Sequence, residues 1–172
     1  MIALKNILVA TDFGEAADSA RAYGRELARR FDAALHVLHV AENVYITAFG
    51  AETYASFAPD LQRDIEESAH RRLNEAVIDS DNSGPRTIPA VMTSGSPSFA
   101  IIDYANDHEI DLIVMGTHGR GTLGHFLMGS VAERVVRLAG CPVLTIRQPE
   151  RDFVHPDGLA RVRQPMPIAR TV

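Results

Sequence analysis

The residues whose types and spacing most directly suggest binding chemistry lie between positions 116 and 130. The stretch GTHGRGTLGHFLMGS follows the apolar run DLIVM and ends where a helical pattern begins. Glycine has no Cβ atom, so Gly116 and Gly119 let the backbone turn tightly and approach a bulky anion. Gly129 and Ser130 open the following helix, whose first amides have no intrahelical partner and whose dipole attracts negative charge. The stretch therefore predicts a phosphate site built mainly from backbone amides.

Three side chains within this stretch can add positive charge to it. His118, Arg120 and His125 give a chain of formal net charge −5 a local group of hydrogen-bond donors. Contact with phosphate is one interpretation of the two histidines, a solvated position in the loop is the commoner one, and neither is assigned a catalytic role. Arg120 is the one candidate to stabilise charge on the phosphates. The alternative interpretation is that the glycines form ordinary turns and that Ser130 is only a helix cap.

Two other nucleotide motifs fit this stretch less well. GRGTLG, residues 119–124, satisfies the dinucleotide pattern G-x-G-x-x-G, but that pattern normally follows the first strand of its unit, with an acidic residue ending the next strand. The next predicted strand is the last one, so an NAD site would need Glu150 as its ribose carboxylate. No Gly-Lys-Ser or Gly-Lys-Thr occurs in the chain, which excludes a Walker A loop.

Metal and thiol chemistry have little support in the sequence. His36 and His39 are three residues apart in a predicted strand, so they should point to opposite faces, and neither has a partner at metal-ligand spacing. We therefore expect no metal held by protein ligands. The single cysteine, Cys141, is expected to be a small buried hydrophobe.

Length and charge narrow the class of protein. A chain of 172 residues suits one domain with its own core. The negative net charge argues against nucleic acid or an anionic membrane surface as partner, and no stretch approaches the roughly 20 apolar residues that span a bilayer. The start, MIALKNILVATDF, predicts a strand and not a signal peptide. We expect a cytoplasmic protein.

Strand and helix patterns alternate along the chain. Short apolar runs predict strands at residues 6–10, 34–40, 87–92, 111–115 and 142–146. Apolar residues at helical spacing predict helices at 15–31, from 60 to the breaker run at 79–85, at 96–108 and at 130–139. Ser96 is the expected N-cap of the third helix and Gly140 the expected C-cap of the last.

This alternation predicts a single-domain α/β fold, an open parallel five-stranded sheet with helices on both faces and the Rossmann-like strand order 3-2-1-4-5. Pro89 cannot donate to a strand ladder, so the third strand should lie at an edge. DLIVM is apolar on both faces and should be central. Ligands bind such sheets where the strand order reverses, so we expect a site between ATDFG, residues 10–14, and the glycine-rich stretch.

The spacing Gly116-x2-Gly119-x9-Gly129-Ser130, with ATDFGEAA, DLIVMGTHGRG and GSVAERVVRLAGCPVLTIR, resembles the ATP-binding branch of the universal stress protein family. The resemblance covers about residues 1–147 and implies a nucleotide-binding domain there. Residues 148–172 hold four of the nine prolines, and we expect them to form an extended or disordered tail.

The resemblance also implies which residues hold ATP. Asp12 would bind the ribose or the adenine end, the backbone near Val40 and Met115 would hold the base, and the terminal phosphates would meet the start of the last helix. The implied residues are Ala10, Thr11, Asp12, Val40, Met115, Gly116, Gly119, Gly129, Ser130 and Val131. Asp12 and Glu15 also fit a capping box, so a helix cap is the alternative role for Asp12.

The function that follows is an ATP-binding sensor or adaptor in a stress response, loaded with ATP and with Mg²⁺ held through the phosphates. We expect slow hydrolysis or none. The alternatives are a slow ATPase or phosphotransfer enzyme, and a dimeric scaffold that does not use nucleotide. The resemblance and the apolar fifth strand, PVLTI, both point to a homodimer paired through that strand. The connection at residues 43–59 is either a lid over the base or a partner contact.

Overall fold

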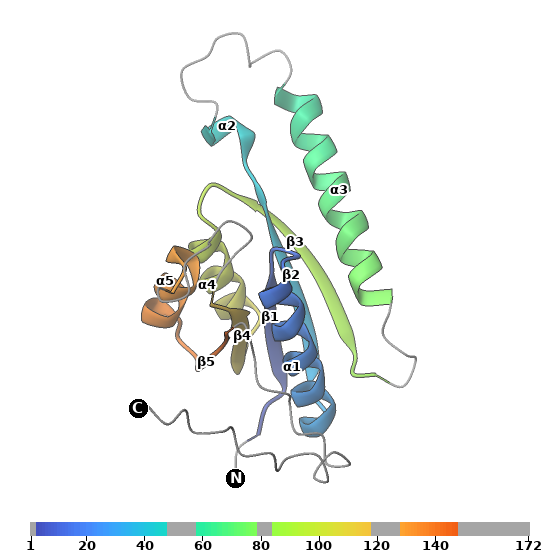
Figure 1. The fold of residues 1–172 in the computed structure, drawn as a ribbon, viewed down its shortest axis with the longest axis vertical. Coiled ribbons are helices and arrows are strands. Elements are labelled where there is room, and N and C mark those ends of the chain that lie inside the picture. The colour runs from blue at the N-terminus through green and yellow to red at the C-terminus, as the bar shows by residue number, and fades with distance from the viewer. Residues whose placement is uncertain (1–2, 48–57, 79–83, 118–127, 148–172) are drawn as a thin grey trace, which may run out of the picture.

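The computed structural model describes residues 3–47, 58–78, 84–117 and 128–147. Its strands form one parallel sheet in the order β3-β2-β1-β4-β5. The strands are β1 (Asn6–Thr11), β2 (Ala34–Glu42), β3 (Thr87–Ser94), β4 (Leu112–Gly116) and β5 (Val143–Ile146) (Figure 1). The predicted fold class, strand order and central position of β1 and β4 are confirmed, as is the edge position of the strand that contains Pro89.

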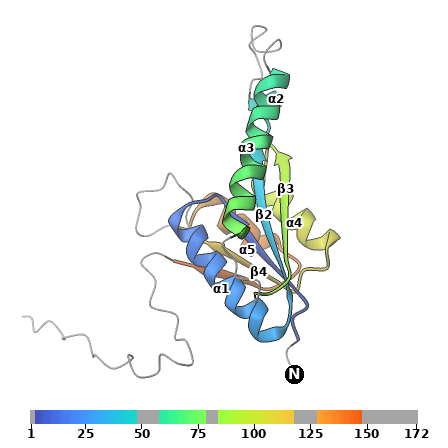
Figure 2. The same ribbon diagram turned by 90° about the vertical axis from the view of Figure 1, so that its right-hand side faces the viewer.

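Helices cover both faces of this sheet, as predicted. They are α1 (Glu15–Phe31), α2 (Val44–Thr47), α3 (Ala58–Ile78), α4 (Pro97–Asp107) and α5 (Ser130–Leu138). The four long helices match the predicted ones, whereas the single turn of α2 was not predicted. Helices α1 and α3 lie on one face and α4 and α5 on the other (Figures 1 and 2). Among the described helices, none is both long and apolar enough to cross a membrane.

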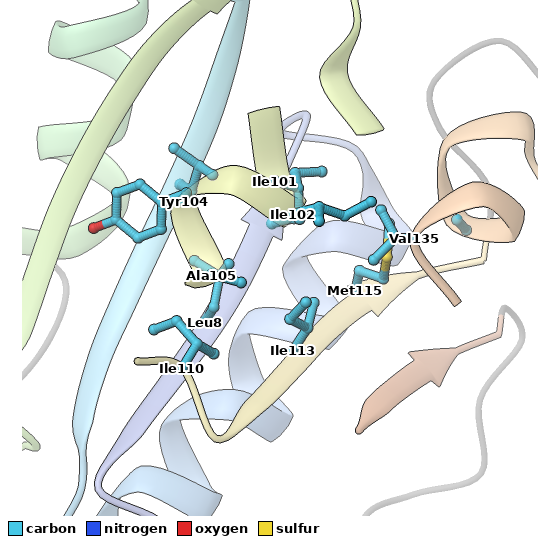
Figure 3. Close-up of a cluster of buried hydrophobic side chains, with 12 residues drawn as sticks. Leu8, Ile101, Ile102, Tyr104, Ala105, Ile110, Ile113, Met115 and Val135 are labelled. Atoms are coloured by element: carbon cyan, nitrogen blue, oxygen red, sulfur yellow. The ribbon is translucent and has the colours of Figure 1, made fainter. Parts of the chain in front are cut away.

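Successive side chains of the central strands point to opposite faces of the sheet and so divide the core into two layers. Ile7 and Val9 of β1 pack with α1 and α3, whereas Leu8 and Ala10 pack with α4 and α5. All four are buried, because helices cover both faces of the strand. Figure 3 shows the second layer, in which side chains of α4 lie over β1 and β4.

Helix α1 lies close to the sheet because the side chains on its inner face are small. Ala17, Ala20, Gly24 and Ala28 are its buried positions together with Ala16. A Cβ atom added at Gly24 would collide with a methyl group of Val9, which is fully buried. The glycine therefore permits α1 to approach the sheet closely. This packing explains why a glycine occupies the middle of a helix, where it is otherwise unfavourable.

Two of the predicted helix caps are wrong. Gly14, and not Asp12, is the N-cap of α1, so Asp12 and Glu15 form no capping box. Helix α5 ends with Ala139 as C-cap in extended conformation, and Gly140 does not adopt the left-handed conformation of a glycine cap. Ser96 is the N-cap of α4, with Pro97 at the first helical position, as predicted.

The amino end of α3 and the short helix α2 project beyond the rest of the molecule (Figure 2). Gln62 fastens this projection, because its Oε1 accepts a hydrogen bond from the Val44 amide at 3.0 Å and its Nε2 donates to the Glu42 carbonyl at 3.3 Å. The side chain of Leu61, an apolar residue on this part of α3, is 44% exposed. Tyr45 on α2 is also exposed.

A cluster of three rings lies at the opposite end of the sheet, with His36 and Tyr104 buried and His108 exposed. The His36 Nδ1 and the Tyr104 hydroxyl are 2.9 Å apart and hydrogen-bonded, and the Tyr104 ring stacks on His108 with centroids 3.8 Å apart. Burial lowers the pKa of His36 below its usual 6.5, and the nearby His108 and Arg86 lower it further. The folded protein therefore keeps His36 neutral.

This lowered pKa predicts acid sensitivity. Below about pH 6.5 the unfolded chain binds a proton at His36 more readily than the folded chain, so stability should fall as the pH decreases from 6.5 toward the lowered folded-state value. Gln at position 36 can hydrogen-bond Tyr104 but cannot titrate. We expect His36→Gln to flatten the decrease in unfolding free energy over this window, measured by urea denaturation. His70→Gln, at an exposed position on α3, is the control and should leave the decrease unchanged. Equal slopes for the parent and His36→Gln would contradict this assignment.

Candidate functional site

A cavity of about 310 Å³ lies at the carboxyl ends of β1, β2 and β4. Nine of the ten residues that the sequence assigned to a site line it: Ala10, Thr11, Asp12, Val40, Met115, Gly116, Gly129, Ser130 and Val131. The tenth, Gly119, lies outside the described residues, as do His118, Arg120, His125 and Glu150. The cavity thus gathers four separate stretches of the sequence at the predicted point of the sheet.

The cavity exists because the chain leaves the two central strands toward opposite faces. After β1 it enters α1 on one face, and after β4 it reaches α5 on the other. The register sets Ala10 of β1 beside Met115 of β4 and Leu38 of β2, so β1 and β4 end at one level, whereas β2 continues to Glu42. A parallel sheet opens a crevice at such a point.

One half of the cavity is apolar. Leu38, Val40, Ile101 and Met115 line it, from β2, α4 and β4, with Pro97 at the start of α4. This wall suits a flat apolar group such as a nucleic acid base. The sequence interpretation did not include Leu38, Ile101 or Pro97. One signal for Pro97 was available, because a helix that follows a parallel strand begins at the edge of the sheet where that strand ends, which is the edge that holds the cavity.

The other half is formed by the start of α5. The Gly129 amide donates to the Thr117 carbonyl at 2.8 Å, which brings the two described ends of the glycine-rich stretch together. The amide of Gly129 is thus already hydrogen-bonded, and the amides aligned with the helix dipole are those of Ser130 and Val131, which have no intrahelical acceptor. Gly129 adopts φ −63° and ψ 150°, a conformation open to any residue.

The packing of α1 explains why position 116 is a glycine, without reference to a ligand. A Cβ atom there would lie 2.7 Å from the Ala16 Cβ and 3.0 Å from the Ala16 carbonyl carbon. These atoms belong to the first turn of α1, and the backbone atom cannot move without shifting that helix. The glycine at the end of β4 is therefore required by the packing of α1, although Gly116 also lines the cavity.

The turn between β1 and α1 is held by its own side chains. The Thr11 Oγ1 accepts a hydrogen bond from the Phe13 amide, and the Asp12 Oδ1 accepts one from the Gly14 amide, each at 3.0 Å. Phe13 has φ 61°, a left-handed conformation that bulky residues rarely adopt. These bonds take the place of the predicted capping box and hold Asp12 at the cavity wall.

Few titratable groups face the cavity. Among the described lining residues they are Asp12 and His39, and the His39 Nδ1 is hydrogen-bonded to the Thr11 carbonyl at 2.8 Å. His39 lies on the α3 side of the sheet beside Phe13, whereas His36 contacts Tyr104 of α4, so the predicted opposite orientation is confirmed. In the described part of the chain, no group of three or more His, Cys, Asp or Glu could hold a metal ion.

Cys141 lies away from this cavity. It is half-buried against the core between the sheet and α4–α5, and burial raises the pKa of its thiol. A raised pKa disfavours the reactive thiolate. The predicted hydrophobic role is therefore supported, with partial instead of complete burial.

Comparison with known proteins identifies one family. The model of the universal stress protein family matches residues 3–147. A universal stress protein of Methanocaldococcus jannaschii is 30% identical over 148 residues, which cover 86% of this chain and 85% of that protein. The solved universal stress protein UspA of Lactobacillus plantarum is 28% identical, with a TM-score of 0.69, and the match covers 86% of this chain and 100% of that one.

A third comparison concerns a ligand complex. The universal stress protein of Archaeoglobus fulgidus, solved in complex with dAMP, is 22% identical, with a TM-score of 0.54. The match covers 85% of this chain and 99% of that one. At this identity the likeness concerns the fold.

Proposed function

Because the chain belongs to the universal stress protein family, we propose that it binds ATP in the cavity at the carboxyl ends of β1, β2 and β4 and acts as a nucleotide-loaded sensor or adaptor in a stress response. One observation carries the proposal. Residues from four separate parts of the chain, which the family resemblance implied as ATP-binding, meet around a single cavity with an apolar half and an amide-rich half.

The two halves define how the nucleotide would lie. The adenine would enter the apolar half between the end of β2 and α4, where Val40 and Met115 lie. The ribose would lie near Asp12, and the terminal phosphates would accept hydrogen bonds from the amides of Ser130 and Val131. Mg²⁺ would be held by phosphate oxygens and water, because Asp12 is the one carboxylate among the described lining residues. The Archaeoglobus fulgidus protein, which has the same fold, was solved in complex with dAMP, an adenine nucleotide.

Two alternatives use the same fold differently. A slow ATPase or phosphotransfer enzyme would bind the same nucleotide and turn it over, and a dimeric scaffold would leave the cavity unused. The G-x-G-x-x-G stretch keeps NAD as a competing ligand. Equilibrium titration with ATP and with NAD, followed by a product assay, separates these functions, and the ligand that co-purifies with the protein gives an independent answer.

The phosphate position predicts the effect of charge at Gly129. Asp fits the backbone conformation there and is a favoured N-cap residue, so Gly129→Asp should fold at least as stably as the parent. Its carboxylate would occupy the amides that the phosphates need and would repel them. We expect ATP affinity to fall by about tenfold to a hundredfold, the size of one lost charge-assisted hydrogen bond, measured by isothermal titration calorimetry.

Gly129→Asn is the matched control for this variant. Asn has the same shape and a similar capping preference but no charge, so it should weaken ATP binding less than Asp does. If folded Gly129→Asp binds ATP as tightly as the parent, the phosphates do not lie at the start of α5.

We also expect ATP to be hydrolysed slowly or not at all. Fast phosphoryl transfer needs a group that orients water at the γ-phosphate and cations that neutralise the developing charge. The titratable residues among the described lining are Asp12, directly after β1, and His39, within β2. The phosphates are assigned to the start of α5, so neither residue belongs to the element that would hold them. Single-turnover hydrolysis with Mg²⁺ measures this directly. A rate near the ~1 to 100 per second of kinases would establish the enzyme alternative.

We further propose a cytoplasmic homodimer joined through β5. Among the described strands, β5 ends the sheet opposite β3 and has a neighbour on one side only, and such an edge is a template for a second copy. Val136 and Leu138 on the neighbouring helix α5 are exposed apolar residues. Light scattering at tens of micromolar should give twice the 18.8 kDa mass of one chain, and a monomer mass would refute the dimer.

A further inference from the structure

Phe13 is held between two side chains on the far side of the turn from the nucleotide cavity. Its ring contacts His39 with centroids 4.5 Å apart, and the Arg72 guanidinium carbon lies 4.2 Å from its ring centroid. The second distance is within the range of a cation–π interaction. Phe13 itself does not line the nucleotide cavity, although its neighbours Thr11 and Asp12 do.

The backbone of this turn depends on such contacts. A phenylalanine at φ 61° persists only where its surroundings hold it, because its Cβ atom is crowded in that conformation. The Thr11 hydroxyl holds the Phe13 amide from inside the turn, and His39 and Arg72 hold the ring from outside. The ring contacts therefore help to fix the direction in which Asp12 meets the cavity.

Arg72 of helix α3 contacts the turn. A hollow of about 300 Å³ separates the helix from the turn, so they are not packed tightly along their length. It is lined by Phe13, His39 and five residues of α3: Asp64, Ile65, Ser68, Ala69 and Arg72. No described residue of α3 lines the nucleotide cavity. The guanidinium of Arg72 spans the hollow and joins an element outside the cavity to the turn that forms its wall.

We propose that Arg72 is a positioning residue for the nucleotide and that, through it, α3 responds to whether the cavity is occupied. The inference rests on the proposed ATP binding. Nucleotide at Asp12 stabilises the strained turn, the turn presents the Phe13 ring to Arg72, and the contact restrains α3. Coupling of this kind is reciprocal, so restraint of α3 by another molecule raises nucleotide affinity by the same factor.

The test uses three variants of the full chain. Arg72→Met keeps the length of the side chain and removes the charge, Arg72→Lys keeps a cation, and Arg71→Met removes a charge from the next position on α3, which has an exposed side chain and does not line either cavity. We expect Arg72→Met to weaken binding of Mg²⁺–ATP about twofold to fivefold, which is the limit that one exposed cation–π contact sets. Arg72→Lys should restore most of the affinity, and Arg71→Met should leave it at the parental value.

Thermal unfolding without nucleotide separates positioning from stability. Arg72 is exposed, so all three variants should unfold near the parental temperature. Hydrogen exchange of residues 58–78 gives the second readout, because ATP should slow exchange in α3 of the parent and of Arg71→Met but much less in Arg72→Met. Parental affinity and parental α3 protection in Arg72→Met overturn this inference alone. Absence of adenine-nucleotide binding by the parent overturns the proposed function and the inference together.

Discussion

The structure depends on one constraint, which is that β1 and β4 lie side by side while the chain leaves them toward opposite faces of the sheet. This arrangement opens a cavity at the carboxyl ends of the strands and brings the β1–α1 turn and the start of α5 to its rim. It requires α1 to begin directly against β4. Ala16 in the first turn of α1 therefore leaves no room for a Cβ atom at position 116, which is a glycine. Packing and ligand access are thus determined at the same glycine.

Under the proposed function, the described lining of the cavity offers more for holding a nucleotide than for reacting with it. Its apolar wall and the amides of α5 provide surface for a base and for phosphates without desolvating a charged side chain. The described lining side chains that can titrate are engaged in the turn itself, since Asp12 accepts from the Gly14 amide and His39 is bonded to the Thr11 carbonyl. Groups with such structural partners are poorly placed to activate water.

A binding protein that reports its occupancy needs an element that changes with the ligand. The β1–α1 turn has the required properties, because it lines the cavity on one side, contains a residue in a rarely populated conformation, and contacts α3 on the other. Strain held by surrounding contacts responds to small changes in those contacts. The projecting end of α3 extends this response away from the cavity, to a region fastened to β2 and α2 by Gln62.

The sequence by itself determined the elements and their order in the sheet, because hydrophobic periodicity and Pro89 are local signals of buried strands and edges. Its resemblance to a family also implied nine residues of the cavity lining, but not Leu38, Ile101 or Pro97. The sequence did not determine why particular residues occupy the site. Asp12 and Glu15 fit a capping box by spacing, yet Gly14 caps the helix. Gly116 suggested room for an anion, yet the first turn of α1 fills that space. Only the tertiary structure placed Phe13, His39 and Arg72 together, since contacts among residues so far apart in the chain leave no periodic trace in the sequence.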